Sequence, residues 1–442
     1  MYLAYSLLVV LAVLLGSPYF IYQAIRHRKY VGSLRQRLGR LPISLNLDSD
    51  ASIWIHAVSV GEVLSARPLV EALRQRYPML RLYVSTTTMT GQQVVRQQLQ
   101  QAIDGAFYFP FDFAFIVRRV LNVVRPKLVV LVENEIWPHL LRECHRRGVK
   151  SMIVNGRISA RSFPRYRLAR PFFARVLAYV DRFCMQGEES ARRAIELGAD
   201  PARVTITGSL KFDSATRMDS HPRGRGRVLR FLRVSPDRVV IVAGSTMRGE
   251  ERAVLQAFRR IKAATPTAML ILAPRHAERF EEAVQLAAGE GFLTLRRTEL
   301  AIDAEPRADV VVLDTIGELA QVYQLATVAF VGGSLVETGG HNILEPAVFG
   351  RPVMFGPHMS NFAEIAATFL ANRAAVQVSS ARELEDELAA LVADPVRRAS
   401  VGAAARALVD ANRGALDRTI DAIVRLLPPT RPATIHPFRV VH

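Results

Sequence analysis

Cysteine is scarce in this chain of 442 residues, where only Cys144 and Cys184 are present. Two thiols are too few for a disulfide framework or a structural zinc site, so we expect a reducing compartment. We find no short internal repeat or low-complexity tract, and 50% of the residues are hydrophobic and 22% charged, which excludes disordered, collagen-like and polytopic membrane proteins. The length allows two or three folded domains.

Acidic residues are too few to balance the basic ones, and the formal net charge is +18. Such an excess usually serves an anionic partner, namely nucleic acid, a membrane or a phosphorylated substrate. Residues 157–175 hold six arginines and no acid, with four aromatic residues between them. This mixture favours contact with anionic lipid headgroups, and nucleic-acid binding or a merely solvated face are the alternatives.

Charged side chains are also missing from residues 1–25, an apolar run long enough to span a bilayer as a helix. We predict a membrane anchor here. The basic residues 26–29 follow at once, so the positive-inside rule places the rest of the chain on the cytoplasmic face of the inner membrane. Gly16 and Pro18 interrupt the run, which leaves open whether the helix spans the membrane or lies in its interface. A cleaved signal peptide is disfavoured, since no basic segment precedes the run and no small-residue cleavage site follows it.

Beyond residue 25, short β-branched runs alternate with amphipathic stretches, which indicates repeated βαβ units and parallel sheets. The series breaks near Lys211 in a polar stretch rich in Gly and Pro, and then begins again. We therefore predict an α/β protein with two Rossmann-like, doubly wound domains facing across a cleft. The predicted parts are an anchor (1–25), an N-terminal domain (26–210), a linker (211–228), a C-terminal domain (229–427) and a Pro-rich tail (428–442).

Three residues, two in the first domain and one directly after it, are candidates for catalysis. Glu62 follows the first predicted strand, where a helix begins, and either serves as a general base or only compensates the helix dipole. Glu133 and Glu135 follow a buried strand, and we expect them to point to opposite faces, with only Glu133 at the cleft. Lys211 lies where the first domain ends and is suited to a phosphate or carboxylate, or to an interdomain salt bridge.

Four clusters follow predicted strands in the second domain, beginning at Gly244, Ala273, Asp314 and Gly332. Glycines after strands let backbone amides approach phosphates, and a helix predicted to begin near Asn342 adds its positive end. The clusters therefore favour a nucleotide site, although they match neither Walker A nor the dinucleotide fingerprint. Arg275 is suited to a phosphate or sugar carboxylate, and Glu345 to ribose hydroxyls.

No histidine spacing predicts a metal site. The triplet Asp48-Ser49-Asp50 is similar to the acidic triplet of metal-dependent glycosyltransferases, but it precedes a strand, and we interpret it as a polar loop.

These segments together resemble the 3-deoxy-D-manno-octulosonic acid (Kdo) transferases of lipopolysaccharide synthesis. The similarity extends from the predicted anchor to about Asn361. The segments that carry it are HAVSVGE, RYP, TTT, PKLVVLVENEIWP, ISARS, TGSLKFD, STMRGEE, PRHAERF, DTIGEL, VGGSLVETGGHNILEP and GPHMSNF.

The resemblance implies a GT-B glycosyltransferase that moves Kdo from CMP-Kdo to a lipid A precursor (lipid IVA) without a metal or other cofactor. It implies Glu62 as the proton acceptor, with Glu133 and Lys211 supporting the transition state. The N-terminal domain would bind the acceptor. CMP would be held in the C-terminal domain by Pro274, Arg275, Ile316, Gly317, Glu318, Asn342, Ile343, Leu344 and Glu345. The chain departs from common family patterns at Asn134, Ile316 and Ile343, which we expect to be mild changes.

We therefore expect transfer with inversion and release of CMP. Two other functions remain as alternatives, a sugar-nucleotide epimerase of the same architecture and a non-catalytic membrane-surface binding protein. Neither explains every feature, because an epimerase needs no lipid acceptor and a binding module needs no strand-end clusters in both domains. The sequence does not indicate how many Kdo units are added, the acylation of the acceptor or the oligomeric state.

Overall fold

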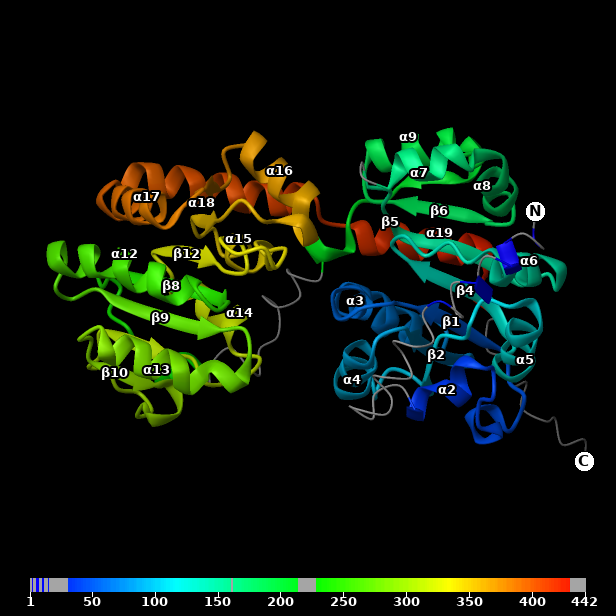
Figure 1. Ribbon diagram of the computed structural model, residues 1–442, viewed down its shortest axis with the longest axis horizontal. Helices are drawn as coiled ribbons and strands as arrows, with labels where there is room; N and C mark the ends of the chain where they lie inside the picture. The colour runs from blue at the N-terminus through cyan, green and yellow to red at the C-terminus, as the bar shows by residue number, and fades with distance from the viewer. Residues whose placement is uncertain are drawn as a thin grey trace, which may run out of the picture. The chain divides into compact units, whose positions relative to one another are not determined.

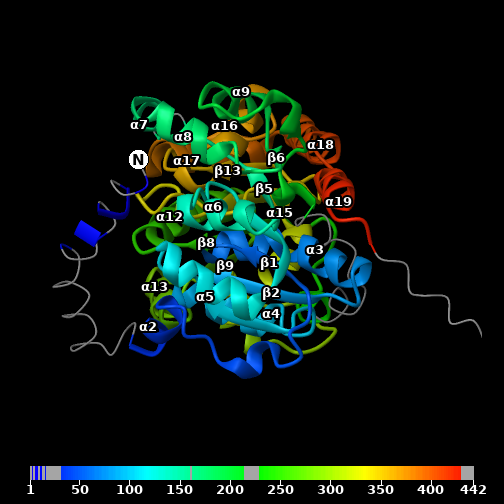
Figure 2. The same cartoon turned by 90° about the vertical axis from the view of Figure 1, so that its right-hand side faces the viewer.

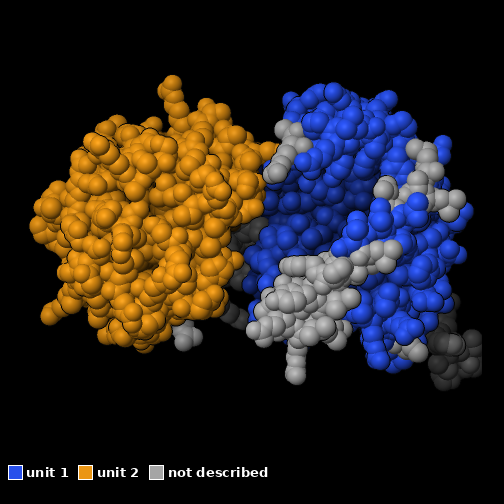
Figure 3. Space-filling view, viewed as in Figure 1, with its two compact units in different colours: residues 1–214, 414–442 blue, residues 215–413 orange. Residues whose placement is uncertain are grey.

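The computed structural model describes residues 31–159, 162–213 and 228–429, together with residues 2, 5–7, 10, 11 and 15. The chain forms two compact units, coloured separately in Figure 3. Unit 1 contains residues 1–214 and 414–442, and unit 2 contains residues 215–413. Two α/β units with parallel sheets confirm the predicted fold class at this level.

Unit 1 is built on a seven-stranded sheet with the order β3-β2-β1-β4-β5-β6-β7, in which every pairing is parallel. Its inner strands are apolar on both sides, as expected for a sheet covered on both faces. Trp54 of β1 faces one core and Ile53 and Ile55 face the other. The strands are β1 (Ser52–His56), β2 (Arg81–Thr86), β3 (Gly105–Tyr108), β4 (Pro126–Val132), β5 (Lys150–Gly156), β6 (Arg182–Met185) and β7 (Val204–Ile206).

Helices cover both faces of this sheet (Figures 1 and 2). Helices α5, α6, α8 and α9 pack on the face that contains Trp54, and α3, α4 and α19 pack on the other. The helices are α2 (Val31–Arg37), η1 (Ile43–Asn46), α3 (Val60–Arg76), α4 (Met89–Gln98), α5 (Ala114–Val124), α6 (Pro138–Arg146), α7 (Phe163–Leu168), α8 (Arg170–Leu177), α9 (Glu188–Glu196), η2 (Pro201–Arg203) and α19 (Ala415–Leu426).

Unit 2 repeats this plan with a second seven-stranded parallel sheet, in the order β10-β11-β9-β8-β12-β13-β14. Helices α12, α13 and α17 bury apolar residues against one face of it. The strands are β8 (Val240–Thr246), β9 (Met269–Pro274), β10 (Thr294–Arg296), β11 (Val310–Val312), β12 (Val328–Val331), β13 (Val353–Phe355) and β14 (Val376–Gln377). The helices are α12 (Glu250–Ala264), η3 (Ala277–Arg279), α13 (Phe280–Gly289), η4 (Arg297–Glu299), α14 (Leu319–Val322), η5 (Tyr323–Leu325), α15 (Leu344–Ala347), η6 (Ser360–Phe362), α16 (Ala363–Ala371), α17 (Ala381–Ala393) and α18 (Pro395–Ala411).

Helix α19 does not belong to the C-terminal unit, although the sequence analysis placed the end of that domain at residue 427. Its apolar residues, among them Leu416 and Ile423, enter a core of unit 1. The carboxylate of Asp213 accepts the N–H groups of Gly414 and Leu416 at 2.9 and 2.7 Å, and so caps the helix. The chain thus leaves unit 1 next to the point where it returns.

Most of the predicted anchor (1–25), most of the linker (211–228) and the tail from residue 430 lie outside the described residues. Within the part of the chain that the structure describes, no helix combines the length and the apolar character needed to cross a bilayer.

Candidate active site

Glu62 lies in the first turn of α3, immediately after the carboxyl end of β1. Its Oε2 accepts the Val58 N–H at 2.6 Å and its Oε1 accepts the Ser59 hydroxyl at 3.1 Å. Ser59 is the N-cap residue of α3, and its hydroxyl oxygen accepts the Glu62 N–H at 3.5 Å. Glu62 thus takes part in a helix cap.

The charge state of Glu62 is set by more than the cap. Burial is the largest influence and, with the negative charges of Glu133 and Glu135, raises the pKa of Glu62 to about 7. The hydrogen bonds from Val58 and Ser59 oppose this rise. A carboxylate with a pKa near 7 is a far better proton acceptor at neutral pH than an ordinary glutamate.

Glu133 and Lys211 are brought together at the carboxyl ends of β4 and β5. Lys211 Nζ lies 3.1 Å from Glu133 Oε1, and the Asn155 amide donates to the same oxygen at 3.3 Å. Asn155 also accepts the Leu210 N–H at 3.0 Å, which fixes the segment that carries Lys211. The sequence analysis missed Asn155, whose signal is an asparagine before Gly156 at a strand end, where a left-handed conformation (φ 54°) is needed.

The prediction that Glu133 and Glu135 point to opposite faces assumed an extended chain, which the structure does not show. Glu133 has a φ of 63°, so the chain turns there instead of continuing as a strand. The alternation of side chains in an extended segment therefore does not apply. The negative charges of both carboxylates contribute to raising the pKa of Glu62.

In unit 2, Pro274 and Arg275 stand at the carboxyl end of β9. The Arg275 N–H donates to the Thr246 carbonyl at 3.0 Å, which leaves the exposed guanidinium outside the sheet. Burial raises the pKa of Glu345 to about 7, while a hydrogen bond from Asn342 and the charge of Arg275 act in the opposite direction. The Asn342 amide donates to Glu345 Oε1 at 3.3 Å. These three side chains thus share one electrostatic environment.

The remaining predicted CMP contacts differ in what they offer. Ile343 and Leu344 are fully buried, so their side chains are not available to a ligand. Ile316 is 85% exposed, and Gly317 has a φ of 90°, as the turn after β11 requires. Glu318 accepts two hydrogen bonds from Arg297, at 2.8 and 2.9 Å, which offsets its charge.

The expected helix near Asn342 begins two residues later, as α15. It has four residues, so its dipole contributes less to an anion site than a full helix would. The loop before it is organised by Glu250, a residue of the cluster at Gly244 to which no role was assigned from the sequence. The buried Glu250 carboxylate accepts the N–H groups of Met247, Gly333, Ser334 and Leu335 at 2.7–2.9 Å. The glycines are necessary, because a Cβ on Gly332 would lie 2.8 Å from Glu250 Oε2.

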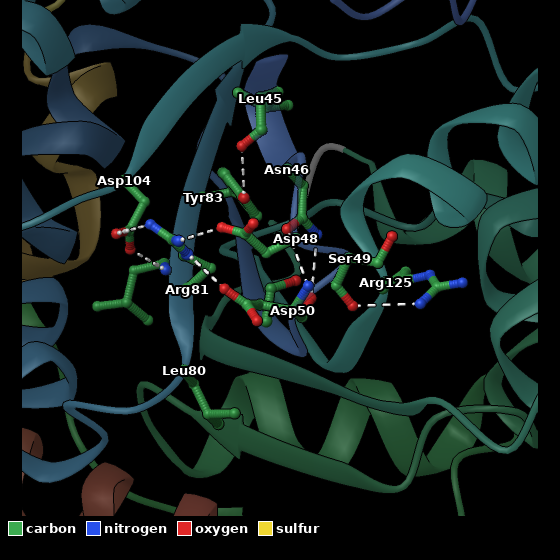
Figure 4. A network of polar contacts seen from close by, with 12 residues as sticks. Leu45, Asn46, Asp48, Ser49, Asp50, Leu80, Arg81, Tyr83, Asp104 and Arg125 are labelled. Atoms are coloured by element: carbon green, nitrogen blue, oxygen red, sulfur yellow. Dashed lines mark hydrogen bonds and ion pairs between the residues drawn. The ribbon is translucent and has the colours of Figure 1, made fainter. Parts of the chain in front are cut away.

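The triplet Asp48-Ser49-Asp50 forms a structural network at the opposite, amino end of the first sheet (Figure 4). Arg81 contacts Asp48 at 3.4 Å, Asp50 at 2.9 Å and Asp104 at 3.4 Å. The arginine thus offsets the acids, in agreement with a polar loop. Among the described residues, no group of three or more His, Cys, Asp or Glu side chains is arranged to hold a metal ion.

The basic segment 157–175 forms α7 and α8, apart from residues 160 and 161, which are not described. The side chains of Arg165, Arg167, Arg170 and Arg175 are exposed, and Leu168 between them is 89% exposed. Arginines beside an exposed leucine suit a surface that contacts lipid headgroups.

Comparison with known proteins follows the division into two units. A family model described as 3-deoxy-D-manno-octulosonic-acid transferase (kdotransferase) matches residues 32–214, and one described as glycosyl transferases group 1 matches residues 239–408. The 3-deoxy-D-manno-octulosonic acid transferase of Haemophilus influenzae is 36% identical over 84% of this chain and 86% of its own length. That of Bordetella pertussis is 36% identical over 88% of this chain and 90% of its own length.

Solved structures resemble the fold at low identity. A putative UDP-N-acetylglucosamine 2-epimerase from Listeria monocytogenes has a TM-score of 0.57 at 13% identity, covering 87% of this chain and 98% of its own. The UDP-GlcNAc 2-epimerase from Neisseria meningitidis has a TM-score of 0.58 at 11% identity, covering 85% of this chain and all of its own. At these identities the likeness concerns the fold alone.

Proposed function

Because the chain belongs to the 3-deoxy-D-manno-octulosonic acid (Kdo) transferase family, we propose that it transfers Kdo from CMP-Kdo to a hydroxyl of the lipid A precursor lipid IVA, with inversion and release of CMP. Kdo transfer in lipopolysaccharide synthesis follows from the relatives, which are similar over most of both chains. The observation that carries the mechanism is Glu62, a carboxylate with a pKa of about 7 at the carboxyl edge of the first sheet.

The proposed reaction is a direct displacement. The acceptor hydroxyl attacks the anomeric carbon of Kdo as its proton passes to the Glu62 carboxylate. The bond from that carbon to the phosphate oxygen breaks, and its electron pair leaves with CMP. Attack opposite the leaving group inverts the configuration, and Glu62 must lose its proton before the next turnover.

Negative charge accumulates on the departing phosphate, and cationic side chains stabilise it. We assign this role to Arg275, and we assign to Lys211 and Glu133 the support of the reacting sugar. Neither a metal nor another cofactor takes part in this proposal. The unit 2 groups at Pro274, Ile316–Glu318 and Asn342–Glu345 hold the nucleotide, with Glu345 as the acceptor for ribose hydroxyls. Unit 1 supplies the acceptor site.

We further propose that the protein acts at the cytoplasmic face of the inner membrane, with residues 1–25 as an anchor. The described part of this segment supports one-sided docking on unit 1. Tyr5 donates to Asp112 at 3.0 Å and Ser6 lies 2.9 Å from His139 Nε2. The apolar residues Leu7, Leu11 and Leu15 are instead 71%, 50% and 73% exposed. A segment with one docked side and one apolar side fits an interfacial anchor, and anionic lipids fit the arginines of α7 and α8.

Mass spectrometry of the lipid product tests the proposal. Purified protein, CMP-Kdo and lipid IVA are incubated together, and we expect lipid IVA carrying added Kdo, with one CMP released per sugar. The number of sugars added is read from the same spectrum. CMP release without acceptor, accompanied by an altered sugar, would instead support the epimerase, to which only the likeness in fold points. Binding to vesicles without any CMP release would support a non-catalytic membrane-surface protein.

A further inference from the structure

We propose that the N-terminal segment is an interfacial positioning element. One side of it, which carries Tyr2, Tyr5 and Ser6, is docked on unit 1, and the opposite side lies on an anionic bilayer that contains the lipid acceptor. The inference rests on the proposed function, because it concerns how the enzyme meets that acceptor. The sequence pattern alone left open whether this segment spans the membrane or lies in its interface.

Hydrogen bonds attach the docked side to two places on unit 1. Tyr5 donates to Asp112 Oδ2 at 3.0 Å, and Ser6 Oγ lies 2.9 Å from His139 Nε2. Asp112 stands just before α5, and His139 is in the first turn of α6. Because the Asp112 carboxylate is buried, a hydrogen bond to it is stronger than one between groups in water.

Aromatic packing adds to these hydrogen bonds. The Tyr5 ring stacks on Phe172 of α8, with ring centroids 5.7 Å apart. Tyr2 packs against the core cluster that contains Trp54, and the guanidinium carbon of Arg142 lies 4.3 Å from the centroid of its ring. Stacked rings and a cation over a ring both favour the docked arrangement.

The opposite side of the segment is apolar. The described residues of the segment are helical. Leu7, Leu11 and Leu15 are four positions apart, so they share one side of a helix, and this side lies about opposite to the docked residues. All three leucines are exposed. Such a side inserts among lipid headgroups, and the exposed arginines of α7 and α8 suit anionic ones.

The docked contacts determine the topology as well. Unit 1 holds the docked residues, and it holds α2 again. There the Tyr108 N–H donates to Gln36 Oε1 and the Phe111 N–H to the Arg37 carbonyl, both at 2.9 Å. Both ends of the segment 7–30 therefore lie on the same side of the bilayer. A return to that side needs two crossings of about 20 residues each, for which this segment is too short.

Docking reaches the candidate site through Asp112. Its carboxylate also accepts the N–H groups of His139 and Leu140, both at 2.9 Å, in the first turn of α6. Trp137, the N-cap residue of α6, makes no side-chain hydrogen bond to that turn. The connection from β4 to α6 carries Glu133. The carboxylate that holds the N-terminal segment thus also caps the helix at the end of this connection.

Depth-dependent fluorescence quenching tests the arrangement on the bilayer. A dye is attached to Leu7→Cys, Leu11→Cys or Leu15→Cys in the full chain, bound to phosphatidylglycerol vesicles with spin-labelled lipids. Both native cysteines are buried. We expect equal, shallow depths at the three positions, because the helix lies along the surface. In a crossing helix the first and last positions would differ in depth by about 12 Å, and this result would overturn the proposal.

Met79→Cys is the control for this measurement. Met79 is an apolar residue in the turn before β2 and is 78% exposed. A dye at this position should stay unquenched. Quenching at the three leucine positions no stronger than at Met79 would show that this side of the segment does not contact lipid, and it would equally overturn the proposal.

Tyr5→Phe tests the link between docking and transfer. It removes the hydroxyl that binds Asp112 and keeps the ring on Phe172. Because a hydrogen bond to a buried carboxylate is lost, kcat/KM for lipid IVA embedded in vesicles should fall about tenfold. The value for lipid IVA in detergent micelles should stay at that of the wild type, since a dispersed acceptor does not need a fixed orientation of unit 1. A merely structural defect would lower both values alike.

Tyr83→Phe is the matched control for this variant. It also removes one tyrosine hydroxyl from unit 1, the one that donates to the Leu45 carbonyl at 2.7 Å, but Tyr83 is in β2 and not among the contacts of the N-terminal segment. The ratio of the vesicle and micelle values should follow the wild type.

Equal losses with both forms of the acceptor in Tyr5→Phe, or no loss with either, would overturn the positioning role. If Tyr5→Phe does not fold, Ser6→Ala, which removes the contact with His139, is measured in the same two assays and judged in the same way. A wild type that transfers Kdo to neither form would defeat the proposed function alone, since the depth measurement requires no turnover.

Discussion

Replacing Glu62 by Gln tests the proposed base and the energetic cost of keeping it buried in one variant. The pKa of Glu62 is raised from its usual 4.5 to about 7. One pKa unit corresponds to about 1.4 kcal/mol, so ionising Glu62 in the folded protein costs roughly 3 kcal/mol of stability. Gln occupies nearly the same volume and keeps an oxygen for the Val58 N–H.

The sign of the pH dependence follows from the two pKa values. Between pH 4.5 and 7 the folded protein keeps a proton on Glu62 that the unfolded chain has lost. The contribution of Glu62 to the free energy of unfolding therefore falls as pH rises through this window, and the whole penalty is present above pH 7. Glu62→Gln removes that penalty. The free energy of unfolding of the variant, relative to that of the wild type, should therefore be higher at pH 8 than at pH 5.

Two assays measure these effects. Initial rates with CMP-Kdo and lipid IVA should fall by about two to four orders of magnitude in Glu62→Gln, the range expected for losing a general base, while CMP-Kdo affinity stays unchanged. In thermal unfolding, the loss of stability between pH 5 and pH 8 should be smaller in the variant than in the wild type. Glu71→Gln, on the same helix, is the control for both. Near wild-type turnover would refute the base, and identical pH dependences of unfolding would refute the buried, perturbed carboxylate.

Further variants probe the scaffold and the membrane surface. Asp213→Ala removes both acceptors at the start of α19 and should destabilise unit 1 by about 2 kcal/mol in thermal or denaturant unfolding. Glu250→Gln leaves buried N–H groups of the loop before α15 facing an amide, so it should lower the free energy of unfolding by about 3 kcal/mol. The same variant should bind CMP-Kdo more weakly in calorimetry. Reversing Arg165 and Arg167 to Glu should lower binding to phosphatidylglycerol vesicles at least roughly tenfold in sedimentation, without changing binding to neutral vesicles. Equal binding of both vesicle types by the wild type would contradict the lipid surface.

Inner strands and edge strands of the two sheets differ in how clearly the sequence pattern indicates them. Continuous β-branched runs marked the inner strands, because a strand covered on both faces has no polar side. The edge strands of the two sheets, β3, β7, β10 and β14, are too short for such a run. They are two to four residues long and largely half-buried or exposed, so they carry no comparable pattern.

The residues of the candidate site were predictable where a charged side chain directly follows the end of a strand. Glu62, Glu133 and Lys211 were named from such positions, and the structure places Lys211 beside Glu133 and both acids in one electrostatic environment. Their catalytic roles stay predictions until the variants are measured. The extended chain assumed for Glu133 to Glu135 is absent, because the left-handed Glu133 ends the alternation, and single-residue dihedrals are not visible in a hydrophobic pattern.

By itself the sequence determined the family, the two α/β units and the strand-end motifs, because ordered motifs and buried runs are local properties of the chain. Only the tertiary structure decided that α19 completes the first unit, that Asn155 fixes the segment carrying Lys211, and that Glu250 holds the glycine loop of the second. Each of these depends on a contact between residues 55 to more than 200 positions apart. Burial and neighbouring charge, which give Glu62 its pKa, likewise arise only when such distant segments are packed together.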